Sequence, residues 1–299
     1  MLYDLIVSRS PIEKGWSGDR KFCVTVADGT KYLLRISSMD RLERRKREFA
    51  RMGQVSQLGV PMCRPVEFGV CEEGVYSLQG WIDGGDAESL ILAMRPGEQY
   101  RYGRDAGEIL AKLHTIPAPE DVLGWEERFN AKIDRKIAMY ENCRLKYEVG
   151  GEAFLAYIAQ NRHLLKDRPQ SYQHGDYHIG NMMIDRKGVL TIIDFDRDDF
   201  GDPWEEFNRI VWCAQAAPAF ATGMVDGYFG GEAPEDFWKL LALYICSNTL
   251  SSLPWAVSFG EKEVQVMQVQ AREVLNWYDG MKHFVPKWYI PYMAVTGNI

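Results

Sequence analysis

The sequence predicts an α+β, bilobal fold, in which a small antiparallel β lobe with one main helix precedes a larger, mostly helical lobe. Strand-like runs are concentrated before residue 82, and helical periodicity dominates after it. The chain has 299 residues, enough to bury a core in each of two lobes. We therefore expect a small β lobe over residues 1–82 and a helical lobe over residues 83–299.

The β lobe begins with a hairpin. Residues 21–27 and 31–36 are rich in β-branched and aromatic side chains, and Asp28-Gly29 between them is a tight-turn signal. A charged helix is expected from Asp40, because Leu42, Phe49 and Met52 recur on one face. Residues 65–69 and 75–82 read as two further strands, which gives a strand-strand-helix-strand-strand order.

The rest of the chain reads as helices. Ala106, Ile109, Leu110 and Leu113 follow the i, i+3, i+4, i+7 spacing of an amphipathic helix. Further helices are expected over residues 129–147 and 152–165, and from Pro203 to the end. One segment, residues 171–196, breaks this pattern and resembles a strand hairpin.

Composition narrows the classes of partner. The six cysteines are scattered without a C-x-x-C pair, which favours free thiols in a reducing compartment. The N-terminus lacks a signal-peptide core and no apolar run reaches membrane-spanning length, so we expect a cytoplasmic protein without a membrane partner. A formal net charge of −7 argues against nucleic acid and is compatible with a cationic small molecule.

The segment with the clearest chemistry lies in that hairpin. Residues 174–181 read His-Gly-Asp-Tyr-His-Ile-Gly-Asn, and residues 189–196 read Val-Leu-Thr-Ile-Ile-Asp-Phe-Asp after a Lys-Gly turn. Such a hairpin brings Asn181 close to Asp194, and both supply the oxygen ligands that Mg²⁺ prefers beside phosphates. Asp176 stands where a hydroxyl can be oriented and deprotonated. Each residue alone also fits a turn, a cap or a strand end, but the set at this spacing favours phosphoryl transfer.

The motif H-G-D-x-H-x-x-N, followed by I-I-D-F-D and G-D-P-W, resembles the aminoglycoside phosphotransferase and choline kinase family. That resemblance implies a protein-kinase-like fold and transfer of the γ-phosphate of ATP or GTP to a hydroxyl of an aminoglycoside or a similar amino- and hydroxy-bearing molecule. It implies Asp176 as the catalytic base and Mg²⁺ held by Asn181 and Asp194. His174, His178 and Asp202 correspond to positions that support the loop.

The resemblance also assigns nucleotide-binding positions in the first lobe. Residues 13–21 lie where a phosphate loop would fold, although they lack its glycine pattern and a plain hairpin turn fits them as well. Arg35 stands where kinases usually carry a lysine, and Glu48 is its expected helix partner, with a solvent-facing charge as the alternative. Backbone groups of Gly80, Trp81 and Ile82 would bind the purine edge.

The substrate side is less defined. Asp196, Asp198, Glu206 and Trp277 are the weak candidates for contacts to the acceptor, against the alternative of solvated charges and core aromatics. A metabolic kinase for a choline-like or sugar substrate, and a non-catalytic nucleotide-binding regulatory module, stay open as alternatives. A protein kinase is disfavoured, because no A-P-E-like segment follows Asp194. The sequence leaves open a monomer or a homodimer, ATP or GTP, and a role in antibiotic resistance.

Overall fold

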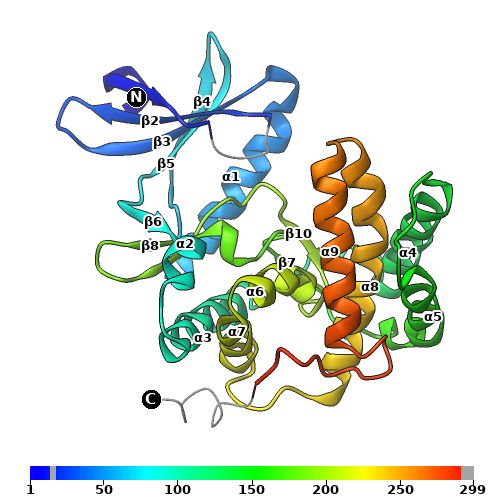
Figure 1. Cartoon of the computed structure of the whole chain (residues 1–299). Coiled ribbons are helices and arrows are strands. Elements are labelled where there is room, and N and C mark those ends of the chain that lie inside the picture. The colour runs from blue at the N-terminus through cyan, green and yellow to red at the C-terminus, as the bar shows by residue number, and fades with distance from the viewer. Residues whose placement is uncertain (14–17, 291–299) are drawn as a thin grey trace. The chain divides into compact units, whose positions relative to one another are not determined.

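A computed structural model describes residues 1–13 and 18–290 of the chain (Figure 1). Contacts within the chain define two compact units. Unit 1 comprises Met1–Leu90 together with Asn181–Asp198, and unit 2 comprises Ile91–Gly180 together with the described residues from Asp199 onward. Antiparallel sheets and helices are both present, so the predicted α+β class is confirmed.

Unit 1 is built on a five-stranded antiparallel sheet. Its strand order is β1-β2-β3-β5-β4, and the strands are β1 Ile6–Pro11, β2 Arg20–Val26, β3 Lys31–Ser37, β4 Pro65–Cys71 and β5 Gly74–Gly80. Val24, Leu34 and Leu78 are fully buried and belong to one hydrophobic cluster of the sheet. Gly29 takes a φ of 85° in the β2–β3 turn, as the Asp-Gly signal predicts.

The edge strand β1 is absent from the sequence-based expectation. In this strand only Ile6 is partly buried and the five following residues are exposed, so no alternation of apolar residues marks it. Backbone pairing with β2 from Ile6–Val26 to Pro11–Phe22 forms it instead. The expected phosphate loop falls partly on residues 14–17, which lie outside the described residues.

Helix α1, Leu42–Gln57, follows β3 as expected. Its buried positions are Glu48, Met52 and Val55, whereas Leu42 and Phe49 are half-buried. A carboxylate therefore shares the inward face with apolar side chains, and this placement requires charged partners nearby.

The segment Asn181–Asp198 belongs to unit 1 although it follows 90 residues of unit 2 in the chain. It forms the hairpin of β8, Met182–Asp185, and β9, Leu190–Ile192, and β6, Gly84–Asp86, pairs with β8. The backbone of Ile192 also accepts from Cys63 at 3.1 Å and donates to Pro61 at 3.0 Å. The stretch 83–86, expected as a break, thus contains a short strand that anchors this hairpin.

Unit 2 consists of helices and one two-stranded pair, β7 with β10. Figure 1 shows α8 lying beside α9, α4 and α5, and the contacts agree. The elements are α3 Pro96–Leu113, α4 Trp125–Asn142, α5 Gly151–Asn161, β7 Ser171–Gln173, β10 Asp199–Gly201, α6 Ile210–Ala216, α7 Pro218–Phe229, α8 Glu235–Val257 and α9 Glu261–Trp277. Helix α2, Ala87–Leu92, crosses the division between the units in the chain.

Two expected helices end earlier than predicted. Helix α4 stops at Asn142 rather than near residue 147, because Cys143 is extended and the Lys146 ammonium caps the free carbonyls of Tyr140, Glu141 and Cys143 at 2.7–2.9 Å. Helix α5 ends at Asn161 and continues as a 3₁₀ turn over Arg162–Leu165. Among the described helices, α8 is long and apolar enough to cross a membrane, but 67% of that window is buried inside the structure.

Candidate active site

Asp176 lies in a loop of unit 2 between β7 and the 3₁₀ turn Ile179–Asn181. Gly175 before it takes a φ of 81°, which turns the chain sharply after β7. The Asp176 carboxylate is 18% exposed and lies 3.2 Å from the Nε of Arg209 and 3.8 Å from the Nε2 of His178. A partly exposed carboxylate fixed by a cation is suited to orient a hydroxyl.

A buried glutamate holds this loop. Glu206 is 1% exposed, and its carboxylate accepts hydrogen bonds from the backbone N–H of Gly175 at 3.0 Å and of Tyr177 at 3.4 Å. Burial, together with the charge of Glu205, raises the pKa of Glu206 to about 7, while these N–H groups act to lower it. Glu206, expected as a weak substrate contact, therefore lies beneath the loop and binds its backbone.

The two histidines of the motif are also engaged with the loop backbone. His174 is fully buried, and its Nδ1 accepts the N–H of Asp176 at 3.3 Å. The Nδ1 of His178 accepts the N–H of Gly180 at 3.1 Å. Both contacts fit the expected supporting role, since each ring closes a tight turn next to a polar residue of the motif.

Asp202 is a buried junction in unit 2. Its carboxylate accepts hydrogen bonds from Nε and Nη2 of Arg168 at 2.7 and 3.0 Å, from the hydroxyl of Tyr244 at 2.5 Å and from the N–H of Trp204 at 3.0 Å. The bidentate pair offsets the cost of burying the charge. Asp202 thus fastens the segment after β10 to α8, which carries Tyr244.

Asn181 and Asp194 lie on unit 1, at the two ends of the β8–β9 hairpin. The N–H of Ile193 donates to the carbonyl of Asn181 at 3.0 Å, so the backbone of Asn181 lies next to the residue before Asp194. Asp194 has a φ of 68°, a left-handed conformation that is uncommon for a residue with a side chain. The hairpin therefore places two oxygen-bearing side chains at adjacent positions.

These two residues fit a magnesium ion. They offer an amide and a carboxylate oxygen, and Mg²⁺ in phosphoryl-transfer sites takes one or two such protein ligands and fills its other positions with phosphates and waters. Within residues 1–13 and 18–290, no group of three or more His, Cys, Asp or Glu side chains could hold a metal on its own. The donor set suits a metal that arrives with phosphates rather than an all-protein cage.

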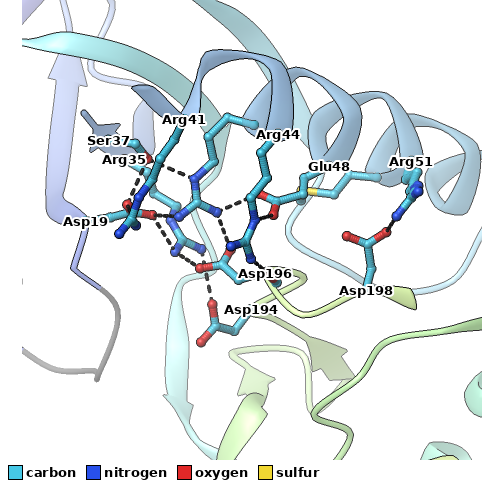
Figure 2. A network of polar contacts seen from close by, with 12 residues as sticks. Asp19, Arg35, Ser37, Arg41, Arg44, Glu48, Arg51, Asp194, Asp196 and Asp198 are labelled. Carbon is cyan, nitrogen blue, oxygen red and sulfur yellow. Dashed lines mark hydrogen bonds and ion pairs between the residues drawn. The ribbon is translucent and has the colours of Figure 1, made fainter. Parts of the chain in front are cut away.

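Arg35 is the centre of a charged network in unit 1 (Figure 2). This β3 residue is 5% exposed, and its guanidinium contacts three carboxylates: Asp19 at 3.1 Å, Asp194 at 3.1 Å, and Asp196. Burial alone would lower the pKa of Arg35, and the charges of Asp196, Asp194 and Asp19 together raise it. A guanidinium so held stays charged.

The carboxylate expected to pair with Arg35 does not do so. Glu48 contacts Arg44 at 2.7 Å and Arg45 at 2.6 Å on its own helix rather than Arg35 (Figure 2). Arg44 and Arg45 precede Glu48 by four and three positions, and residues at these separations lie on the same side of a helix. Asp19 takes the expected place of Glu48 beside Arg35.

The remaining predicted residues have varied surroundings. Asp198 pairs with Arg51 of α1, and Asp196 contacts Arg35. The N–H of Gly80 donates to the carbonyl of Arg64 at 2.8 Å, and Trp81 and Ile82 are half-buried after β5. Trp277, half-buried, is the last residue of α9 in unit 2.

Residues 8–238 match the phosphotransferase enzyme family. This span is more than half of the chain and runs from β1 into α8. The chain belongs to that family. It is therefore a phosphotransferase.

Solved structures share the fold of this phosphotransferase at low sequence identity. A thermostable mutant of the aminoglycoside phosphotransferase APH(4)-Ia in its apo form has a TM-score of 0.66 at 15% identity, covering 91% of this chain and 95% of that chain. A complex of a mutant of that protein with ADP and hygromycin B has a TM-score of 0.65 at 16% identity, covering 92% and 96%. A choline/ethanolamine kinase family protein from Mesorhizobium loti has a TM-score of 0.64 at 17% identity, covering 92% and 91%.

These likenesses show that the phosphotransferase has the protein-kinase-like fold that the sequence predicts. A search of the curated proteins returns no match.

Two residues of this phosphotransferase site escaped the sequence analysis. Asp19 lies just before β2, within the stretch expected as a phosphate loop. Its pairing with Arg35 of β3 and Arg45 of α1 could not be predicted from that stretch alone. Arg209 lies 33 positions after Asp176, within a short 3₁₀ turn over Glu205–Arg209. No local spacing marks either residue, so only the folded chain reveals their partners.

Proposed function

We propose that this phosphotransferase transfers the γ-phosphate of ATP or GTP to a hydroxyl of a small molecule, with Asp176 as the general base. The observation that carries the proposal is the loop 174–181 itself. It presents Asp176 beside Arg209 while Glu206 and both histidines hold its backbone. A loop whose N–H groups are bound on the buried side keeps the carboxylate in one orientation, as positioning catalysis requires.

Asp176 would accept the proton of the attacking hydroxyl. Its Oδ1 lies 3.2 Å from the Nε of Arg209, a contact that would orient the carboxylate toward the hydroxyl. Arg209 would keep the carboxylate in place through the transfer. His178, 3.8 Å from the same Oδ1, would hold the turn that leads to Asn181.

Asn181 and Asp194 would hold a magnesium ion that neutralises charge on the phosphates when it is bound. Arg35 would support the nucleotide side by fixing Asp194, which its buried guanidinium contacts at 3.1 Å. Glu48 would act one step away, by holding Arg45 next to Asp19. Gly80, Trp81 and Ile82 stay the candidates for the purine edge.

Structures of similar fold support a nucleotide as co-substrate. Mutants of APH(4)-Ia are complexed with ADP or AMP-PNP together with hygromycin B. For this chain the same reasoning makes ATP or GTP the donor and makes aminoglycosides, choline-like amines and amino sugars the first acceptors to assay. Neither nucleic acid nor a membrane is needed as a partner.

The decisive experiment is an assay of ADP and GDP release across that acceptor panel with the wild type and Asp176→Asn. We expect kcat to fall by about 10²–10⁴-fold, the usual contribution of a general base. Nucleotide affinity should change little, because Asn keeps the shape of the side chain. Asp121→Asn, at an exposed position of unit 2, serves as the matched control.

Two outcomes would contradict the proposal. Turnover that survives Asp176→Asn at the wild-type rate removes Asp176 from the chemistry. Turnover that survives chelation of magnesium, and is unchanged by Asn181→Ala and Asp194→Ala, removes the metal assignment.

A further inference from the structure

We propose that the acceptor carries an anionic group, a carboxylate or a phosphate, beside its reacting hydroxyl, and that Lys136 binds this group. The inference rests on the proposed function, since it describes the acceptor of the same transfer. It comes from a group of cations in unit 2: Lys132, Lys136 and Arg209.

Lys132 and Lys136 stand one turn apart on the same side of α4. The ammonium of Lys132 pairs with Glu205 at 3.0 Å. The ammonium of Lys136 instead lies 3.5 Å from the Oδ1 of Asn248 on α8, a neutral acceptor at the limit of hydrogen-bond distance. Among the residues that the structure describes, no carboxylate reaches Lys136 within ion-pair distance.

These lysines belong to the same part of unit 2 as Asp176. Lys132 contacts Glu205, which shares the 3₁₀ turn Glu205–Arg209 with Arg209, and Arg209 contacts Asp176 at 3.2 Å. Burial, followed by the charge of Lys132 and then of Arg209, lowers the pKa of Lys136 to about 7, against the opposing charge of Glu205. The environment thus disfavours the proton that an anionic ligand would restore.

The carboxylates nearby are already used within the protein. Glu205 is buried and binds Lys132 and the side-chain amide of Gln173, the latter at 3.2 Å. Glu206 accepts the backbone of the loop. Neither is left to bind the amino groups of a polycationic acceptor.

A half-buried cation beside two other cations is unfavourable, unless an anion joins them. If the side chain at position 136 served only for packing, a neutral side chain of similar size would give a more stable protein than lysine does. An acceptor with a carboxylate or phosphate explains why a lysine stands here, because it pairs with the ammonium while its hydroxyl reaches Asp176.

The test compares pairs of acceptors that differ by one anionic group. The pairs are ethanolamine with serine, choline with carnitine, and glycerol with glycerol 3-phosphate. ADP or GDP release is measured for the wild type, Lys136→Met and Lys136→Arg. We expect kcat/KM of the wild type to favour the anionic member by about 10–100-fold, the effect of one charge-assisted hydrogen bond. Lys136→Met should bring this ratio toward 1 through KM, and Lys136→Arg should retain most of it.

Lys166→Met, at an exposed position of unit 2, is the matched control and should keep the wild-type ratio. A wild type that prefers the neutral or cationic members, or a ratio that Lys136→Met leaves unchanged, overturns the inference while the phosphotransferase reaction stands.

A binding measurement decides the inference where no acceptor of the panel is turned over, an outcome that would count against the proposed function alone. Glycerate and glycerol 3-phosphate are titrated calorimetrically into protein saturated with ADP and magnesium. Binding to the wild type that weakens about 10-fold or more in Lys136→Met supports the anion site, and glycerate against glycerol 3-phosphate separates carboxylate from phosphate. The inference is overturned if wild type and Lys136→Met bind these anions with equal affinity, or if neither protein binds them.

Discussion

Arg35 in unit 1 and Lys136 in unit 2 are both withdrawn from solvent, but their neighbours have opposite charge. Three carboxylates contact Arg35, and they raise its pKa. Two cations act on Lys136, with Glu205 as the single opposing charge, and its pKa falls to about 7. The first cation is compensated by the protein itself, whereas the second is compensated only when another anion joins it.

This contrast separates two uses of buried charge. A compensated network fixes side chains in place at a high cost of disruption. An uncompensated cation contributes little to stability and is available to a ligand. Variants at the two centres should therefore differ in what they damage: stability for the network of Arg35, selectivity for Lys136.

Arg35→Met should have the largest effect on stability. It leaves the buried Asp19 and the half-buried Asp196 without their shared guanidinium, and removing one partner of a buried ion pair costs about 3–5 kcal/mol. The measurement is the free energy of unfolding in urea. Arg20→Met is the control, since the pair of Arg20 with Glu73 is exposed and is worth only about 0–1 kcal/mol. A loss for Arg35→Met no larger than for Arg20→Met would show that the network is not a stabilising one.

Glu206→Gln should change how stability depends on pH. The pKa of Glu206 is about 7 in the folded protein against 4.5 ordinarily, so its protonated form is favoured by folding. Glu206 therefore contributes about 3 kcal/mol to the free energy of unfolding below pH 4.5, and this contribution is lost as pH rises through 7. Glutamine does not titrate, so the variant should gain stability relative to the wild type between pH 5 and pH 8. Parallel unfolding curves across this range would contradict the assignment.

The sequence could predict the parts of the site that are local. Asn181 and Asp194 belong to one hairpin, and the pattern of two short strands around a Lys-Gly turn marks it. The β2–β3 hairpin and α1 were predicted in the same way, because apolar periodicity and turn residues act within a few positions.

Features that depend on distant residues were not predictable. Strand β1 has no apolar alternation, and pairing with β2 alone defines it. The partner of Arg35 was expected on α1, but Arg44 and Arg45 compete for Glu48 at one turn's distance. Which carboxylate pairs with Arg35 depends on the geometry of the folded unit rather than on spacing along the sequence.

Asp19→Asn should have an intermediate effect. Burial alone would raise the pKa of Asp19, but the hydrogen bond from Ser37 and the charges of Arg35 and Arg45 lower it overall. Asparagine keeps the contact to Ser37 and loses the charge, at a cost of about 2 kcal/mol for contacts to charged groups. Because the lowered pKa stabilises the fold above pH 3.8 and is lost in acid, the deficit should shrink as pH falls. Asp28→Asn, in the exposed β2–β3 turn, is the control and should lose little.

Glu48→Gln should have the smallest effect, and it tests directly which carboxylate serves Arg35. Glu48 contacts Arg44, which is 58% exposed, and Arg45, which keeps its contacts to Asp19 and Ser37. We expect a loss below about 1 kcal/mol, as for partly exposed pairs on one helix, and a KM for the nucleotide within about twofold of the wild type. Asp19→Asn, which removes a direct partner of Arg35, should raise that KM more. If Glu48→Gln instead raises the KM for the nucleotide more than Asp19→Asn does, then Glu48 rather than Asp19 positions Arg35 while the nucleotide is bound, and the pairing in Figure 2 rearranges during the reaction.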